Sequence, residues 1–329
     1  MRAVLPVGKE GVPELGEAPE PSLGPDEVLI QVAAAGLNRA DLLQLRGLYP
    51  PPQGESPIPG LECAGVVAAV GEEVTDWSVG QRVMALLAGG GQAERVSAPA
   101  GQCMAIPARL SLLEAACLPE VALTAWTNLV AEGGVEAGET VLITGAASGV
   151  GTFAVQLARE LGARVFAAGR SLARLEALRP LGASACFELS EHLGRELRSA
   201  NGGRGADLVL DLVGGGWLAS VLAALEPRGR LVLVGLMAGA RAELDLGLIL
   251  ARRLRVQGSV LRPRSRAEKA RLVGQFLRFG ASRLDDGRLH PQLDRAFAFD
   301  QAALAYGYLE ASAGVGKVVL AVDPQLTAS

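Results

Sequence analysis

A glycine-rich turn that follows a short apolar run constrains this chain more than any other feature. The run Thr140–Thr144 is predicted to be a strand, and the turn Gly145-Ala-Ala-Ser-Gly-Val-Gly151 leads into residues with helical spacing. In such a unit, glycine lets the backbone approach a pyrophosphate, while free N–H groups and the helix dipole face the anion. The pattern predicts a dinucleotide site with Ser148, Gly149 and Val150 at the cofactor. A tight turn without a ligand is the alternative.

Residues on both sides of this turn alternate between apolar runs and helical spacing. A second helix is predicted over Leu172–Leu181 and a loop over Arg198–Gly205. Further predicted strands are Arg164–Ala168, Ala206–Leu212, Arg230–Gly235 and Arg255–Val260. Continuous apolar strands between helices are typical of a parallel sheet covered on both faces. We therefore expect an α/β fold with a doubly wound, Rossmann-type sheet.

The segment before this region, up to about Pro119, has a different pattern. Short strands with frequent turns are predicted, among them Val28–Val32, Gly65–Val70 and Arg82–Leu87. The Pro-rich segment Tyr49–Gly54 cannot be helical and is expected to be an exposed loop. This part of the chain is expected to form a small β-barrel.

The tail from about Arg262 is mostly helical and ends in a predicted strand, Gly316–Val322. Because this run has no obvious partner in the middle sheet, we expect it to return to the N-terminal barrel. The expected domains are residues 1–119, completed by 262–329, and residues 120–261.

Composition excludes several classes of protein. The 31 Lys+Arg and 35 Asp+Glu residues give a formal net charge of −4, which argues against a nucleic-acid partner, although Arg252–Arg266 could form a local basic patch. The longest charge-free run, Thr140–Ala158, is interrupted by polar residues, so no membrane span is expected. Four widely spaced cysteines favour reduced thiols and a cytoplasmic location. Two isolated histidines, His192 and His290, leave little material for a zinc site or a Ser-His-Asp triad.

The end of the second predicted strand bears on the choice of nucleotide. NAD sites place Asp or Glu there to bind the ribose, but Ala167–Arg174 contains no acid. Arg170 and Arg174 lie one turn apart beside Gly169 and Ser171, and arginine binds a 2′-phosphate well. The segment therefore favours NADPH, unless both arginines are only solvated surface charges.

Several stretches together resemble a known family. They are Ala35–Asp41, Gly47–Pro52, Pro59–Gly65, Leu123–Trp126, Gly235–Met237, Gly316–Leu320 and the glycine turn with Gln156 and Arg159. With the order of barrel, doubly wound domain and return strand, the chain resembles the medium-chain dehydrogenase/reductase superfamily. Within it, the chain is similar to the zeta-crystallin-like NADPH:quinone oxidoreductases. The resemblance implies a GroES-like catalytic domain with an inserted Rossmann domain, and NADPH in the cleft between them.

The resemblance also bears on metal use. Zinc alcohol dehydrogenases of this superfamily carry Cys where Asn38 stands and His where Leu61 stands. Neither residue here is a good zinc ligand. We therefore expect no metal, and hydride transfer from the nicotinamide to an acceptor that is already electrophilic, such as a quinone or an enone.

Residue roles are implied in the same way. Asn38 and Tyr49 would be the catalytic residues, facing the acceptor beside the nicotinamide. Cofactor contacts would also include Thr124, Gly235, Leu236, Met237, Val260, Leu261 and Lys317. Relatives often carry an aromatic residue at the adenine where Leu189 stands, and Gly where Arg170 stands. Arg174 occupies the place where they set a Lys against the 2′-phosphate.

The function expected from the sequence is zinc-independent reduction of quinones by NADPH. One alternative is an enone or 2-alkenal reductase, because the same hydride geometry serves both acceptors. Another is a non-catalytic, crystallin-like protein that binds NADPH. The resemblance further implies a homodimer joined at the edge strand near Arg255–Val260, where unpaired backbone groups invite pairing.

Overall fold

The computed structural model describes residues 1–7 and 11–327. The chain divides into two compact units. Unit 1 comprises Met1–Leu123 and Leu261–Ser329, and unit 2 comprises Thr124–Val260. The boundaries expected from the sequence lie within a few residues of these.

Unit 2 is a parallel six-stranded sheet in the order β10-β9-β8-β11-β12-β13. Its strands are β8 (Thr140–Thr144), β9 (Arg164–Gly169), β10 (Ala183–Glu188), β11 (Ala206–Asp211), β12 (Leu225–Leu233) and β13 (Arg255–Gly258). Its helices are α4 (Gly149–Glu160), α5 (Leu172–Glu176), α6 (Leu193–Ala200), α7 (Leu218–Ala224) and α8 (Leu246–Arg252), with a π-helical turn at Thr127–Glu132 and a 3₁₀ turn at Gly215–Trp217. The doubly wound sheet is thus confirmed.

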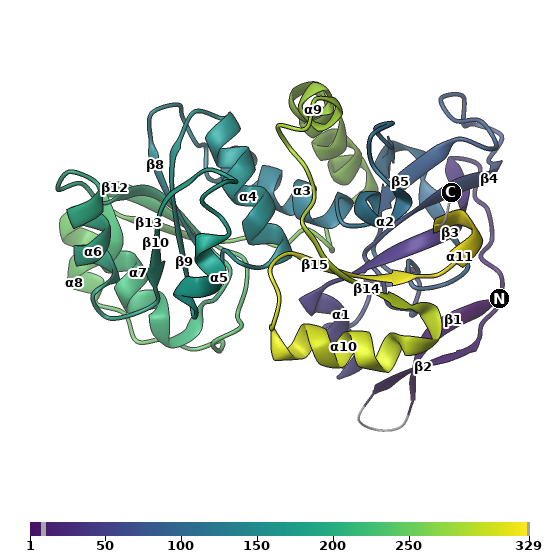
Figure 1. The fold of residues 1–329 in the computed structure, drawn as a ribbon, viewed down its shortest axis with the longest axis horizontal. Coiled ribbons are helices and arrows are strands. Elements are labelled where there is room, and N and C mark those ends of the chain that lie inside the picture. The colour runs from purple at the N-terminus through teal and green to yellow at the C-terminus, as the bar shows by residue number, and fades with distance from the viewer. Residues whose placement is uncertain (8–10, 328–329) are drawn as a thin grey trace. The chain divides into compact units, whose positions relative to one another are not determined.

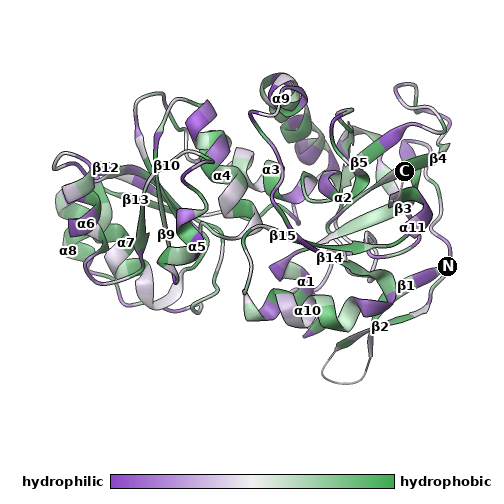
Figure 2. Cartoon of the chain, in the orientation of Figure 1, coloured by the Kyte–Doolittle hydropathy of each residue, from purple (hydrophilic) through white to green (hydrophobic). Residues whose placement is uncertain are grey.

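Helices cover both faces of this sheet. In Figure 1, α4 and α5 lie on one side of the strands, and α6, α7 and α8 lie on the other. Strand side chains such as Leu142, Phe166 and Val209 pack with Leu193 and Val221 of the second helix group. Figure 2 shows β9 as mostly hydrophobic, in keeping with a strand buried between two helical layers.

Several boundaries in unit 2 differ from the prediction. The strand predicted over Arg230–Gly235 is β12, which runs from Leu225 to Leu233, and β13 ends at Gly258, two residues before the predicted end. The helix expected over Leu172–Leu181 ends at Glu176, because Pro180 and the left-handed Gly182 (φ +123°) that follow cannot continue it. The loop expected over Arg198–Gly205 starts later, because α6 continues to Ala200.

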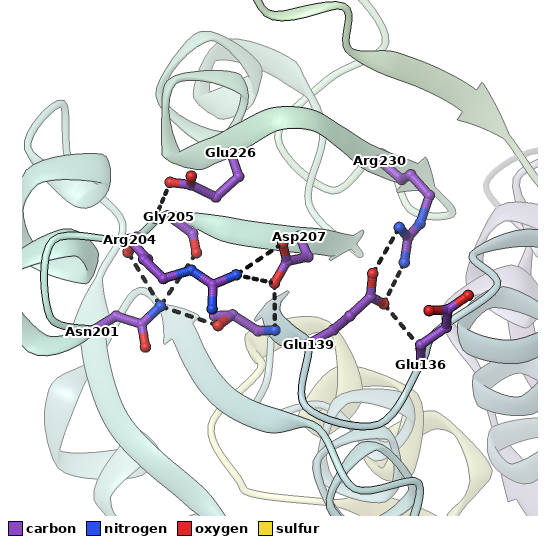
Figure 3. Close-up of polar contacts among 9 residues, drawn as sticks. Glu136, Glu139, Asn201, Arg204, Gly205, Asp207, Glu226 and Arg230 are labelled. Atoms are coloured by element: carbon purple, nitrogen blue, oxygen red, sulfur yellow. Dashed lines mark hydrogen bonds and ion pairs between the residues drawn. The ribbon is translucent and has the colours of Figure 1, made fainter.

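The amino ends of the central strands of unit 2 carry two groups of polar contacts (Figure 3). Arg230 pairs with Glu139, and Asp207 accepts the N–H of Thr140 at 2.8 Å. The amide of Asn201 donates to Thr140 and to neighbouring carbonyls. Most polar atoms of these residues bond to one another, although Arg230 Nε is buried without a partner, and the contacts suit a structural edge of the sheet.

Unit 1 contains a seven-stranded sheet and a separate hairpin. The sheet order is β14-β15-β3-β4-β5-β7, with β6 paired to β3, and β1 pairs with β2. The strands are β1 (Arg2–Val7), β2 (Val12–Glu17), β3 (Glu27–Leu37), β4 (Glu62–Val70), β5 (Arg82–Leu86), β6 (Arg95–Pro99), β7 (Cys103–Ala105), β14 (Leu293–Ala298) and β15 (Lys317–Ala321). β15 is antiparallel to β3, which confirms the expected return of the last strand. β14 was not predicted, because it contains the charged residues Asp294 and Arg295 and lies in a tail that was expected to be mostly helical before its last strand.

The helices of unit 1 lie around this sheet. They are α1 (Arg39–Leu45), α2 (Leu112–Ala115), α9 (Arg266–Asp285), α10 (Ala302–Ala311) and α11 (Pro324–Thr327), with 3₁₀ turns at Ala100–Gln102 and Phe299–Gln301, while α3 (Pro119–Trp126) crosses the boundary to unit 2. The long helix α9 begins after Ser265, whose Oγ accepts the N–H of Glu268. As expected from the prolines, Tyr49–Gly54 is an irregular loop after α1.

Two sequence expectations concern the whole chain. Across residues 1–7 and 11–327, every helix is too short or too polar to cross a bilayer. All four cysteines are buried free thiols.

Candidate active site

Asn38 lies where strand β3 passes into helix α1, at the N-cap of the helix. Its backbone N–H donates to Asp41 Oδ2 at 2.8 Å. Its side-chain Nδ2 donates to Glu62 Oε1 at 2.9 Å, and its Oδ1 accepts from Lys317 Nζ at 2.7 Å. Both ends of the amide therefore have charged partners, which fixes the orientation of this side chain.

Lys317 is the cation of this buried group. Its Nζ lies 2.6 Å from Glu62 Oε1 and donates to the Leu37 carbonyl at 2.6 Å. The exposed side-chain fractions of the pair are 5% for Lys317 and 0% for Glu62. Glu62 Oε2 accepts the N–H of Glu120 at 2.9 Å. Complete pairing of this kind is what allows charges to remain buried.

Asp41 adds a second buried carboxyl group. Its oxygens accept the N–H of Gly60 at 3.1 Å and the side-chain Nε2 of Gln92 at 3.4 Å. Gln92 in turn accepts the hydroxyl of Tyr306 at 2.8 Å. Burial raises the pKa of Asp41 to about 6, and its hydrogen bonds and the Lys317 charge act against that rise.

Glu120, at the start of α3, is a third acid of this group. Burial, followed by the nearby charge of Glu62, raises the pKa of Glu120 to about 8. Asp41, Glu62 and Glu120 thus lie around Lys317, and Glu120, with a pKa of about 8, is mostly protonated at neutral pH. We name Asn38, Asp41, Glu62, Glu120 and Lys317 the Asn38 cluster.

Tyr49 is half-buried at the start of its loop. Arg262 Nη1 donates to the Tyr49 carbonyl at 3.0 Å, and the guanidinium carbon lies 5.2 Å from the centre of the ring. Burial raises the pKa of the Tyr49 hydroxyl, and the charge of Glu120 adds to the rise. Tyr49 is therefore a neutral hydroxyl at neutral pH, able to donate a hydrogen bond.

The glycine turn of unit 2 has the geometry that a dinucleotide site requires. Ser148 is the N-cap of α4, and its Oγ accepts the N–H of Gly151 at 3.1 Å. A Cβ on Gly151 would lie 2.5 Å from the Ala146 backbone, so only glycine permits this close turn. Gly149 and Val150 form the first helical turn, whose N–H groups have no acceptor within the helix. The turn thus fits a bound pyrophosphate.

The end of β9 brings the predicted phosphate contacts together. Gly169 is buried, Arg170 is exposed, Ser171 is the N-cap of α5, and Arg174 lies half-buried in that helix. An acid missed from the sequence, Glu188 on β10, pairs with Gly169 in the sheet and accepts the Leu172 N–H at 3.3 Å. Only the parallel sheet brings it there, because it is far from this strand end along the chain.

Of the remaining predicted cofactor contacts, some are exposed and others are buried. Leu236, Met237 and Val260 are exposed by 52%, 47% and 53%, so they are not ordinary core residues. Gly235 follows β12, and a Cβ there would lie 2.3 Å from the Leu212 carbonyl. Thr124 and Leu261 are buried, within unit 2 and unit 1 respectively.

Lys317 lies in unit 1, and its charge is paired within the Asn38 cluster. The sequence motifs contained Asn38, Asp41 and Glu62, but they gave no role to the two acids. A lone charge inside the apolar run Gly60–Val67 was the one signal that could have marked Glu62. Glu120 and Arg262 carry no local signal.

Leu61, at the other position where the zinc enzymes have a ligand, is buried with 1% exposure. Across residues 1–7 and 11–327, no group of three or more His, Cys, Asp or Glu side chains is arranged to hold a metal ion. Leu189, at the position where relatives often carry an aromatic residue, packs in the core of unit 2.

Two protein families match this chain. Residues 24–108 match the family described as alcohol dehydrogenase GroES-like domain, and residues 149–275 match the family described as zinc-binding dehydrogenase. The human synaptic vesicle membrane protein VAT-1 homolog is 32% identical over 94% of this chain and 82% of its own length. The spectinabilin polyketide synthase system protein NorB of Streptomyces orinoci is 36% identical over 98% of this chain, which spans only 14% of that much longer protein.

Solved structures agree with this fold. A quinone oxidoreductase of Pseudomonas syringae is 28% identical with a TM-score of 0.85, covering 98% of this chain and 98% of that one. The CurK enoyl reductase is 29% identical with a TM-score of 0.85, covering 98% and 99%. Mycobacterial Rv1454c, solved with NADPH, is 28% identical with a TM-score of 0.87, covering 98% and 100%. With its GroES-like unit, its Rossmann-type sheet and these relatives, the chain belongs to the medium-chain dehydrogenase/reductase family of oxidoreductases.

Proposed function

We propose that this chain, as a member of the zeta-crystallin-like group, reduces quinones with NADPH and without zinc. The observation that carries the proposal is the state of Asn38, whose amide is held by Glu62 on one side and Lys317 on the other. Metal binding at this position would break both contacts, and Leu61 offers no ligand atom. An acceptor beside Asn38 must then be electrophilic on its own, as quinones are.

The nicotinamide cofactor supplies the hydride when it is bound. Ser148, Gly149 and Val150 would hold its pyrophosphate at the start of α4. Arg170 and Arg174, beside Gly169 and Ser171, favour a 2′-phosphate and hence NADPH. Relatives extend the contacts to the residues after β12, where Leu236 and Met237 present exposed side chains.

Tyr49 would act on the acceptor. Its neutral hydroxyl can donate a hydrogen bond or a proton to the reduced oxygen, and its ring can stack on a quinone. The three prolines of its loop limit the entropy that the ring loses when an acceptor binds.

The test is a pair of Tyr49 variants measured against one benzoquinone. If the hydroxyl donates, Tyr49→Phe and Tyr49→Ala should lower kcat/KM by similar factors, about tenfold or more, with little change in NADPH affinity. If the ring only stacks, Tyr49→Phe should be mild and Tyr49→Ala severe. Wild-type kinetics in both variants would remove Tyr49 from the site. Activity that is lost on chelation and restored by zinc would refute the zinc-free mechanism.

A second candidate is an enone or 2-alkenal reductase. The likeness to the CurK enoyl reductase favours it, and the same arrangement of Asn38 and Tyr49 could serve a carbonyl-activated double bond. Turnover of a 2-alkenal well above that of a benzoquinone would select this candidate. NADPH binding with no turnover of either acceptor would indicate a non-catalytic protein.

We further propose a cytoplasmic homodimer. β13 is the edge strand of the six-stranded sheet, and the neighbouring helix α8 exposes Leu246 by 66% and Leu250 by 77%. An open edge beside exposed leucines suits pairing with a second copy. The buried free thiols are in keeping with a reducing compartment. Light scattering should give twice the monomer mass; a monomer at micromolar concentrations would refute the dimer.

In the segment Arg252–Arg266, which could form a local basic patch, Arg253 and Arg255 are exposed, Arg262 is 4% exposed and Arg266 pairs with Glu27.

A further inference from the structure

We propose that Arg262 is a positioning residue of the acceptor site, which fixes the Tyr49 loop through the backbone and supports the Tyr49 ring with its guanidinium plane. The kinetic part of this proposal rests on the proposed function. Its structural part concerns this chain alone.

Arg262 binds three residues that are far from it in the sequence, 174 to 218 positions away. Its Nε donates to the Ala88 carbonyl at 2.8 Å, and its Nη1 donates to the Tyr49 carbonyl at 3.0 Å. Its Nη2 donates to Gln44 Oε1 at 2.6 Å. Gln44 lies on α1, so the guanidinium links the helix that Asn38 caps to the loop that carries Tyr49.

Arg262 is buried, so each of its three hydrogen bonds satisfies a donor that water does not reach. Arg262 is 4% exposed, although it is an arginine, and such residues stay buried only when their donors are used. The loop itself has few other ties at this point: Leu48 is 70% exposed, and Gly47 adopts a left-handed conformation at φ +69°. The two backbone bonds from Leu48 and Tyr49 both go to the Leu43 carbonyl. Arg262 therefore holds the far side of the Tyr49 peptide.

The guanidinium also acts on the Tyr49 ring. Its carbon lies 5.2 Å from the ring centre, a favourable cation–π distance. Its charge lowers the pKa of the Tyr49 hydroxyl, against the upward effects of burial and of Glu120. Lysine could keep the charge but could not reproduce the planar fork that donates to Gln44, Tyr49 and Ala88.

The experiment compares Arg262→Gln and Arg262→Lys with the wild type, and uses Arg266→Gln as the matched control. Arg266 lies four positions away and makes a surface pair with Glu27. The first measurement is the ultraviolet titration of tyrosinate, assigned to Tyr49 by subtracting the trace of Tyr49→Phe. It is feasible because the chain has three tyrosines. The second measurement is the rate of chymotrypsin cleavage after Leu48, since Pro50 protects the bond after Tyr49.

The expected results separate positioning from general stabilisation. Arg262→Gln should raise the Tyr49 pKa and speed loop cleavage. Arg262→Lys should keep the pKa closer to wild type but still speed cleavage, and Arg266→Gln should change neither. An unchanged Tyr49 titration and unchanged cleavage in folded Arg262→Gln would overturn the proposal, whether or not the protein reduces any quinone.

A third measurement is a double-mutant cycle of kcat/KM that combines Arg262→Gln with Tyr49→Ala. Arg262→Gln should lower kcat/KM for a quinone by about tenfold to a hundredfold, with NADPH affinity unchanged. In the Tyr49→Ala background, the same substitution should have little further effect, because Arg262 acts through Tyr49. Fully additive losses would overturn the positioning role. If Arg262→Gln does not fold, Gln44→Met removes one of the three acceptors together with the Gln44 donation to the Pro57 carbonyl, so the Tyr49 titration is its decisive measurement. A folded Gln44→Met protein with a wild-type Tyr49 titration would equally overturn the proposal.

Discussion

Two regions of the molecule differ in whether their polar groups are bonded. They are the Asn38 cluster of unit 1 and the carboxyl ends of β8 and β9 in unit 2. In the cluster, buried charged atoms bind one another: Lys317 contacts Glu62, Asn38 and a carbonyl within 2.7 Å. At the strand ends, glycines leave room, the first turn of α4 offers N–H groups, and Arg170 is exposed. The first region is complete without a ligand, and the second is shaped to receive one.

Under the proposed function, the difference separates two tasks: holding a catalytic side chain and receiving a nucleotide. A rigid, fully bonded cluster can hold one side chain, Asn38, in a fixed orientation, as catalysis requires. A nucleotide site must instead leave donors open until the anion arrives. The amino edge of the same sheet, where Arg230, Glu139 and Asp207 are bonded to neighbours, shows that unit 2 closes the edge it does not use (Figure 3).

The largest expected effect comes from breaking the cluster at its cation. Lys317→Met should destabilise the protein by about 3–5 kcal/mol, because it leaves Glu62 as an unpaired buried charge. Denaturant unfolding measures this loss. Adding Glu62→Gln should recover part of it, and the surface variant Arg266→Gln should change stability by less than about 1 kcal/mol. A loss for Lys317→Met as small as that of the control would mean that the cluster is not bonded as described.

The glycine turn should be nearly as sensitive. Gly151→Ala places a Cβ 2.5 Å from the Ala146 backbone, so the turn must shift, at a stability loss of about 1–3 kcal/mol and with weakened NADPH binding. Gly307→Ala is the matched control in α10, because a Cβ there meets no atom within 4 Å. It should stabilise the helix by about 0.5–1 kcal/mol and leave NADPH binding unchanged. Equal effects of the two variants would contradict the role of Gly151. Calorimetry and nucleotide titration give both quantities.

A third test concerns the choice between NADPH and NADH. Charge-assisted contacts to the 2′-phosphate should favour NADPH by about 1–3 kcal/mol. Arg174→Ala should remove much of this preference and leave NADH binding unchanged. Glu188→Gln should increase the preference, because a carboxylate beside Gly169 repels a phosphate. Equal affinities of the wild type for NADPH and NADH would refute the assignment.

The fourth test concerns a pH dependence of stability that arises in the Asn38 cluster. The folded protein holds the Glu120 proton up to a pKa of about 8, against an ordinary value of 4.5. Between these values the unfolded chain binds fewer protons, so this group makes stability fall as pH rises from about 4.5 to 8. Asp41 contributes in the same direction between pH 3.8 and about 6.

Glu120→Gln should therefore flatten the stability profile between pH 6 and 8, where Asp41 no longer contributes. Urea unfolding at a series of pH values measures it. A wild-type slope retained in Glu120→Gln would assign the dependence to another group.

Local sequence was enough for the central strands of unit 2 and for α4, though not for β10 or for α6 to α8. The turn at Gly145–Gly151 and the apolar runs around it predicted the strand, the helix and the parallel sheet, because a parallel α/β unit is built from contacts between consecutive elements. Pro180 also shows why the helix end was misjudged: the periodicity of Leu172–Leu181 continues past the point where the backbone can no longer be helical.

Only the tertiary structure assembled the candidate site of unit 1. Asn38 was identified through a family motif, yet its partners Glu62 and Lys317 come from other strands, and Lys317 is 279 positions away. Arg262 meets the Tyr49 carbonyl across 213 positions. The sequence determined most of the strands, helices and turns, though not β14, since these follow from local spacing and backbone restrictions. Which buried charges meet was decided by strand pairing between the two ends of the chain, because a charge can be buried only where distant segments supply its partners.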